Sequence, residues 1–281
     1  MARHEVVLPP APPVRPEVLV VRAVTGVEEL RALQTPGQQR ALTVLIAACA
    51  HVQGADHPLG VDAARALSCG ERTRVGLAIA VASEGGVVRR ILHCPEERCR
   101  TSVLFEMTLD DLPERAAPPA SGTVRCPVPA DRAQAVRGYA TFRLPDGGDQ
   151  EAVEATSSDF REVGLGGGPV LVRLLDRLLV SVSGHDLPGE TAVWSEEDRQ
   201  SAWNAIRGAL GGPDTETEVS CPLCGMRFVH RVSPLGWLRA DPKESEHRLR
   251  DEVARLRARF GWTEEQALWL PRPERRRLLG G

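Results

Sequence analysis

Two short cysteine pairs lie more than 120 residues apart in this chain, and they constrain its fold more than any other feature. Cys94 and Cys99 frame the segment Cys-Pro-Glu-Glu-Arg-Cys, and Cys221 and Cys224 frame Cys-Pro-Leu-Cys. Thiolates two to four residues apart can turn back onto one metal ion, and four of them fill the tetrahedral shell of a structural zinc. We therefore predict one zinc ion held by Cys94, Cys99, Cys221 and Cys224.

The two halves of this site differ in how strongly they predict a metal. In the second half a proline lies inside the loop and Gly225 follows Cys224, where the backbone must turn with its amides toward sulfur. The first half is looser because four residues separate its cysteines. Each pair is expected at the tip of a hairpin, the geometry of a zinc knuckle. His93 or Cys126 remains an alternative ligand.

Other uses of a Cys-x-x-Cys motif fit less well. A thioredoxin-like site needs a strand before the motif and a helix after it, to lower the thiol pKa. The residues after Gly225 favour a strand instead. A nucleobase deaminase needs a proline before the first cysteine and an upstream His-x-Glu, whereas Ser220 precedes Cys221. A four-thiolate site has no open position for substrate, so we expect no enzyme.

Composition excludes several broad classes. Of 281 residues 42% are apolar but only 4% are aromatic, so the chain can form a core and that core must be aliphatic. A net charge of -3 gives no global attraction to nucleic acid or membrane. No run of about 18 apolar residues and no secretory signal is present. Seven cysteines without an export signal favour a reducing compartment, and we expect the cytoplasm.

Periodicity predicts an α+β protein in three parts. Residues 1–16 form a proline-rich arm, either a loose tail or a strap that docks on a neighbouring subunit. Residues 17–232 form an α+β core with a split zinc ribbon, and residues 233–281 form an amphipathic helix followed by short helices. Expected strands are 17–23, 87–93, 101–109, 123–128, 138–144, 216–220 and 226–232. Expected helices are 38–52, 68–83, one starting at 150, 170–182, 195–210, 244–260, 263–270 and 274–279. Four of them are expected to be capped by the side chains of Ser68, Asp149, Ser195 and Thr263.

The end of the chain resembles a known family. Residues 260–279 read Phe-Gly-Trp-Thr-Glu-Glu-Gln-Ala-Leu-Trp-Leu-Pro-Arg-Pro-Glu-Arg-Arg-Arg-Leu-Leu. This ending resembles that of baseplate hub and hub-assembly proteins of contractile-tailed, T-even-type phages and of related contractile injection systems. Segments 65–72 and 142–152 resemble the same family, as does the order of the two cysteine pairs before a terminal helix pair. The resemblance spans roughly residues 18–281, although its motifs are short and the proline-rich arm is not part of it.

The resemblance implies an assembly role without catalysis. Partners would be other baseplate, hub or tail subunits, with no membrane and no small-molecule substrate. Trp and Arg dominate the energetics of protein interfaces. We therefore expect partner contacts from Trp262, Trp269, Leu270, Arg272, Arg275 and Arg276. The two tryptophans could instead dock the tail on the protein's own core.

Two other functions stay open. A zinc-ribbon nucleic-acid-binding or transcription-associated regulator would show strongly salt-dependent retention of DNA or RNA. The arginines of the C-terminal segment are interleaved with acidic residues, however, which suits a salt-bridged surface better than a DNA-binding stripe. A thiol oxidoreductase would show a titratable Cys221 of low pKa.

Overall fold

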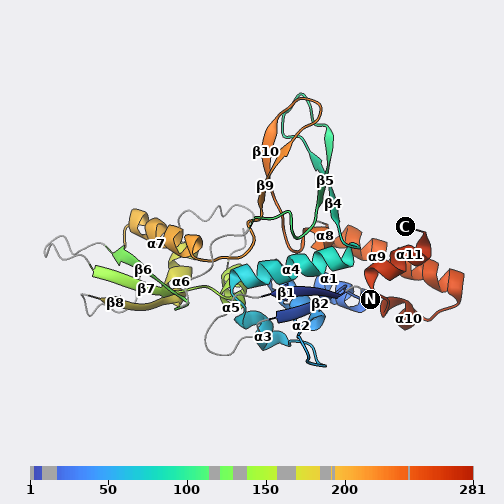
Figure 1. Ribbon diagram of the computed structural model, residues 1–281, viewed down its shortest axis with the longest axis horizontal. Helices are drawn as coiled ribbons and strands as arrows, with labels where there is room; N and C mark the ends of the chain where they lie inside the picture. Colours follow the sequence, from blue (N-terminus) through green and yellow to red (C-terminus); the bar gives the residue numbers. More distant parts are fainter. Residues whose placement is uncertain are drawn as a thin grey trace.

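The computed structural model describes residues 3–7, 18–113, 121–128, 138–156, 169–183, 191, 194–239 and 241–280. Helices and small antiparallel sheets make it an α+β protein, as predicted. The molecule is elongated, with a β arm that projects from its middle (Figure 1). Within the described residues, no helix combines the length and the apolar character needed to cross a membrane.

The main body combines one antiparallel sheet with a layer of helices. Its sheet has the order β1–β2–β3, and helices α2 and α4 pack with β2 in the largest hydrophobic core. Helix α4 begins as predicted, because Ser68 and Glu71 form a capping box. The strands are β1 (Arg3–Val7), β2 (Val18–Arg22) and β3 (Ala50–Val52), and the helices are α1 (Gly26–Gln34), α2 (Gln38–Cys49), α3 (Val61–Ala66) and α4 (Cys69–Ser83).

Part of the proline-rich arm joins this sheet. Arg3–Val7 pairs antiparallel with β2 at one edge of the sheet. An edge position suits a segment followed by prolines, which cannot donate to a sheet ladder. The described part of the arm therefore contacts its own chain, and residues 8–16 lie outside the described residues.

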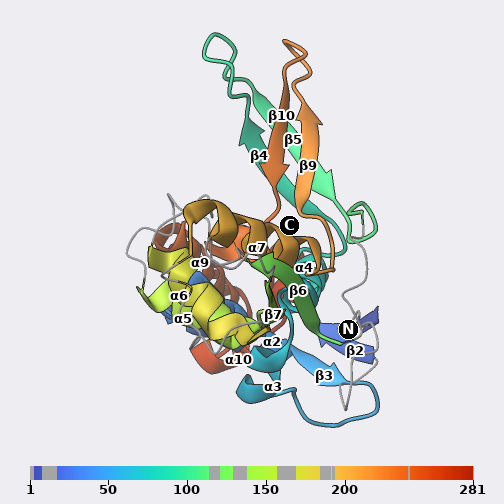
Figure 2. The ribbon, with the colours of Figure 1, turned by 90° about the vertical axis from the view of Figure 1, so that its left-hand side faces the viewer.

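The projecting arm consists of two hairpins from distant parts of the chain. The first comes directly after helix α4, and the second precedes the C-terminal helices. The two hairpins rise side by side from the body (Figure 2). Their strands are β4 (Val88–His93), β5 (Ser102–Met107), β9 (Glu216–Ser220) and β10 (Arg227–Arg231). All four agree with the predicted ranges to within two residues at each end.

A second lobe with its own hydrophobic core lies at one end of the molecule (Figure 1). Its sheet has the order β6–β7–β8, and α6 and α7 pack on it. Helix α5 joins this lobe to the main body, since the Glu154 carboxylate accepts hydrogen bonds from the N-terminal amides of α2. The elements are β6 (Thr123–Val128), β7 (Gly138–Arg143), α5 (Gly147–Thr156), α6 (Pro169–Leu178), β8 (Leu179–Ser183) and α7 (Glu196–Gly208).

The C-terminal helices pack back onto the main body at the other end. Helix α9 ends at Gly261, which adopts the left-handed conformation with φ 71°. Buried residues of α9 and α10 form a third small core, against which Leu30 of α1 also packs. The helices are α8 (Gly236–Arg239), α9 (Pro242–Phe260), α10 (Glu264–Leu268) and α11 (Arg272–Leu279).

Several predicted elements need correction. The predicted helix 170–182 ends at Leu178, and the next five residues form β8 beside β7. A continuous apolar run cannot by itself separate a buried helix from a strand. The predicted helix 38–52 likewise ends at Cys49 and continues as β3. Asp149 is not the cap of α5: the helix already begins at Gly147, and the Asp146 carboxylate accepts from the Asp149 amide.

Candidate metal centre

The four predicted cysteine ligands meet where the two hairpin tips come together. The Cys94 and Cys224 sulfurs are 3.6 Å apart, and those of Cys99 and Cys221 are 3.7 Å apart. All four Sγ atoms lie within 4.8 Å of one another. A single metal ion at the centre of this cluster can reach every sulfur, so the structure confirms the predicted cluster of the four cysteines.

Local backbone geometry turns each tip toward the centre. In the first hairpin, Cys94 N–H donates to the Thr101 carbonyl at 3.0 Å and Cys99 N–H donates to the Glu96 carbonyl at 2.9 Å. In the second, Gly225 N–H donates to the Cys221 carbonyl at 3.0 Å. Gly225 has φ 74°, a conformation that favours glycine. The glycine after the second pair therefore serves the tight turn that the sequence suggested.

Apolar side chains on the inner faces of the two hairpins pack between the cysteine tips and the main body. The side chains of Val103, Phe105, Met107 and Val219 are buried and belong to the core of the main body. The Phe105 ring meets the His230 ring edge-on, with centroids 5.0 Å apart. The two hairpins therefore contact each other through apolar side chains along their length and through the cysteine cluster at their tips.

The outer faces of the arm combine paired charges with exposed aliphatic side chains. Arg89 lies 2.6 Å from Glu106 across the first hairpin, and Arg231 lies 2.5 Å from Glu216 across the second. Five large hydrophobic side chains of the arm are nevertheless exposed: Ile91, Leu104, Leu223, Met226 and Val229. These side chains were not among the predicted site residues. Strict alternation in the strands nevertheless places Ile91 and Leu104 opposite each other, away from the inner face.

Two thiols of the first hairpin, Cys94 and Cys99, differ in pKa. Hydrogen bonds with Thr101 lower the pKa of Cys99 to about 7. Removal from water raises the pKa of Cys94 to about 12. Metal ligation needs thiolates, so metal binding at this centre must release protons and strengthen as pH rises.

The alternative ligands lie elsewhere. Cys126 is buried in the core of the second lobe, where its sulfur points to the Ala202 carbonyl. His93 is exposed and is not among the residues of the cluster. Within the described residues, the cluster contains only the four predicted cysteines.

The Cys221–Cys224 motif does not have a thioredoxin-like setting. Strand β9 precedes the motif and strand β10 follows it. The helix N-terminus that lowers a thiol pKa in such oxidoreductases is therefore absent directly after this motif.

The predicted partner-binding residues of the tail divide into exposed and buried groups. Trp269 is 57% exposed. Trp262 and Leu270 are half-buried against the third core, and the Trp262 ring stacks on Phe260 with centroids 4.8 Å apart. The Arg276 side chain is 36% exposed and forms an ion pair with Glu84 at 3.1 Å.

Arg272 and Arg275 need correction, because both are buried. Arg275 is fully buried, with Nη2 on the Glu29 carboxylate and Nε 3.2 Å from Glu252. Arg272 pairs with Glu29 as well and lies 3.1 Å from Glu84. These two side chains attach the end of the chain to its own α1 and α4, so they are not available to a partner in this structure.

Comparison of the chain with protein-family models, curated proteins and solved structures finds no match.

Proposed function

We propose that the four-cysteine centre binds one structural zinc ion. Zn–S bonds of about 2.3 Å in a tetrahedron place neighbouring sulfurs about 3.8 Å apart. The Cys94–Cys224 and Cys99–Cys221 sulfur separations, 3.6 and 3.7 Å, are close to that value. Four thiolates favour zinc over harder cations such as Mg²⁺ or Ca²⁺, which prefer oxygen ligands.

We further propose that the protein is a structural or assembly component of the baseplate hub of a phage-like contractile injection system. The observation that carries a docking role is the arm, a pair of hairpins whose tips meet, with exposed aliphatic side chains on its outer faces. Exposed apolar side chains grouped on a projecting element are typical of protein-binding surfaces. The more specific baseplate assignment rests on the resemblance of the tail and of the cysteine order. Assembly would take place in the cytoplasm.

The charge of the arm weighs against the nucleic-acid-binding alternative. Its two segments, 88–107 and 216–231, contain six arginines and five glutamates. Three of those arginines have a carboxylate partner on the neighbouring strand. A phosphate-binding surface needs an excess of free positive charge, which this arm has only to a small degree.

Co-purification tests the proposal directly. The chain is co-expressed with candidate sheath, tube, spike and hub proteins of a contractile injection system, and the complex is captured through a tag. We expect one of these proteins to co-purify in a stable complex, and the tip variant L223D/M226D to lose at least nine-tenths of it.

The matched control is V180D, which changes an exposed apolar residue of β8, away from the arm. Capture should be unaffected by this change. Failure of every tail protein to co-purify, or strongly salt-dependent retention of DNA, would contradict the assembly role.

A further inference from the structure

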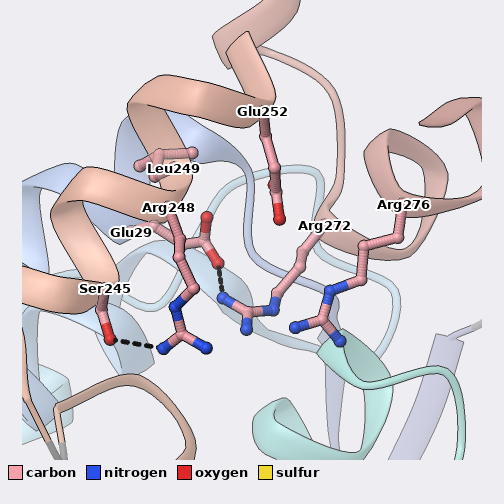
Figure 3. A pocket seen from close by; sticks show the side chains of 7 residues that line it. All are labelled: Glu29, Ser245, Arg248, Leu249, Glu252, Arg272 and Arg276. Atoms are coloured by element: carbon pink, nitrogen blue, oxygen red, sulfur yellow. Dashed lines mark hydrogen bonds and ion pairs between the residues drawn. The ribbon is translucent and has the colours of Figure 1, made fainter. Parts of the chain in front are cut away.

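A small polar pocket lies where the C-terminal helices meet the main body. Arg248 and Glu252 approach it from α9, Arg272 and Arg276 from α11, and Glu29 from α1. The three guanidinium groups gather at one side of the pocket (Figure 3). The pocket offers about 20 Å³ to the centres of water-sized molecules. One water needs about 10 to 15 Å³ in that measure, so the space suits one or two oxygen atoms and no large ligand.

The carboxylates around the pocket are already paired. Both oxygens of Glu29 are held by arginine, one by Arg272 and the other by Arg275. Glu84 uses one oxygen for Arg272 and the other for Arg276, each at 3.1 Å. These acids hold the arginines in place, but each is shared between two guanidinium groups.

Positive charge is consequently in excess here. Arg248 donates to the Ser245 hydroxyl at 3.1 Å, and its nearest carboxylate, on Glu244, is 4.0 Å away. Five arginines (Arg90, Arg248, Arg272, Arg275 and Arg276) face four glutamates (Glu29, Glu84, Glu244 and Glu252) in this region.

Arg90, in strand β4 of the arm, adds a further positive charge to this region. Burial lowers its pKa, Glu84 acts in the opposite direction, and the charges of Arg272, Arg276 and Arg248 lower it further. An anion placed among these guanidinium groups would relieve their mutual repulsion.

We infer that the pocket binds a small oxyanion, a phosphate or carboxylate group, through Arg248, Arg272 and Arg276. Two of the three guanidinium groups are fixed before binding: Arg272 lies over the Trp237 ring at 5.0 Å, and Arg276 is held by Glu84. Planar guanidinium groups match the paired oxygens of such anions. Arg248, whose side chain is 56% exposed, would close over the bound group.

Arginine side-chain NMR tests this inference with inorganic phosphate and with acetate as probes. At low ionic strength we expect saturable shifts of the Nε–H signals of Arg248, Arg272 and Arg276. The R248A variant should bind at least tenfold more weakly, and R248K should fall between it and the unchanged protein because it keeps the charge but loses the planar fork.

The matched control is R250A on the same helix. Arg250 is exposed and pairs with Glu246 at 2.6 Å, so its loss removes the same charge without touching the pocket. Its affinity for the probe should stay within twofold of the unchanged protein. Tighter binding of phosphate would identify a phosphoryl group as the ligand, and tighter binding of acetate would identify a carboxylate group.

Shifts that do not saturate, or equal weakening by R248A and R250A, would overturn the inference. Thermal unfolding of R248A verifies that the variant is folded, as expected for a change at an exposed side chain. The outcome is independent of the baseplate proposal, because that proposal is tested with Leu223 and Met226 at the arm tip, which do not line the pocket.

Discussion

Replacing Arg275 by methionine should detach the C-terminal helices from the main body. Arg275 is fully buried, and its guanidinium contacts Glu29, Glu252 and, at 2.8 Å, the Leu270 carbonyl. Methionine fills much of the same space but leaves Glu29, itself 1% exposed, with Arg272 as its remaining cation. Breaking a buried ion pair by removing one partner costs about 3 to 5 kcal/mol.

Urea denaturation followed by tryptophan fluorescence measures this loss. Trp262 and Trp269 lie in the C-terminal segment, and Trp237 lies under Arg272, so the signal reports on the affected region. We expect the free energy of unfolding of this region to fall by about 3 to 5 kcal/mol. In a domain of this size that corresponds to a fall in Tm of roughly 6 to 20 °C.

The matched control is R277M in the same helix. The Arg277 side chain is 75% exposed and lies 3.7 Å from Glu274, so its loss should cost less than about 1 kcal/mol. A loss below about 1 kcal/mol in R275M would refute the view that this ion-pair cluster holds the tail.

Three further predictions concern the metal centre, the second lobe and a helix cap. C224S removes an exposed ligand and should lower bound zinc from one per chain to a small fraction, with amide exchange in the arm at least tenfold faster. The control L223S, at the same tip, should keep the metal. A C224S protein that still binds one zinc per chain would contradict the site. Burial opposes ionisation of Asp149, but Arg143 and the Asp146 amide lower its pKa overall. The ionised Asp149 carboxylate therefore stabilises the fold above about pH 4, and this contribution is lost as pH falls through the lowered pKa of Asp149. D149N should consequently flatten the acid side of a plot of unfolding free energy against pH. S68A removes the cap of α4 and should cost about 1 kcal/mol in urea denaturation, with no change in bound metal.

Features that depend on neighbours in the sequence were predictable. The capping boxes at Ser68 and Thr263 and the side-chain cap at Ser195 were all identified from spacing, and each cap forms. The two cysteine hairpins were also predicted, because strands flanking a short loop leave a clear pattern. The prediction that their tips meet rested on metal chemistry, since only four thiolates complete a tetrahedral shell.

Features that depend on distant residues were decided by the tertiary structure. The sequence placed Arg272 and Arg275 on a partner-binding surface, yet Arg275 is buried against Glu29, 246 residues earlier in the chain. Nothing in the arginine-rich ending distinguishes a buried guanidinium from an exposed one, because that difference depends on which carboxylate the fold brings near. The error at β8 has the same cause. Residues 179–183 were predicted as the end of a helix, but they form a strand because they pair with β7, a distant segment of the chain. The helix caps and the set of four cysteines were therefore determined by the sequence alone. The burial of Arg272 and Arg275, and the choice between helix and strand in a continuous apolar run, depended on tertiary packing.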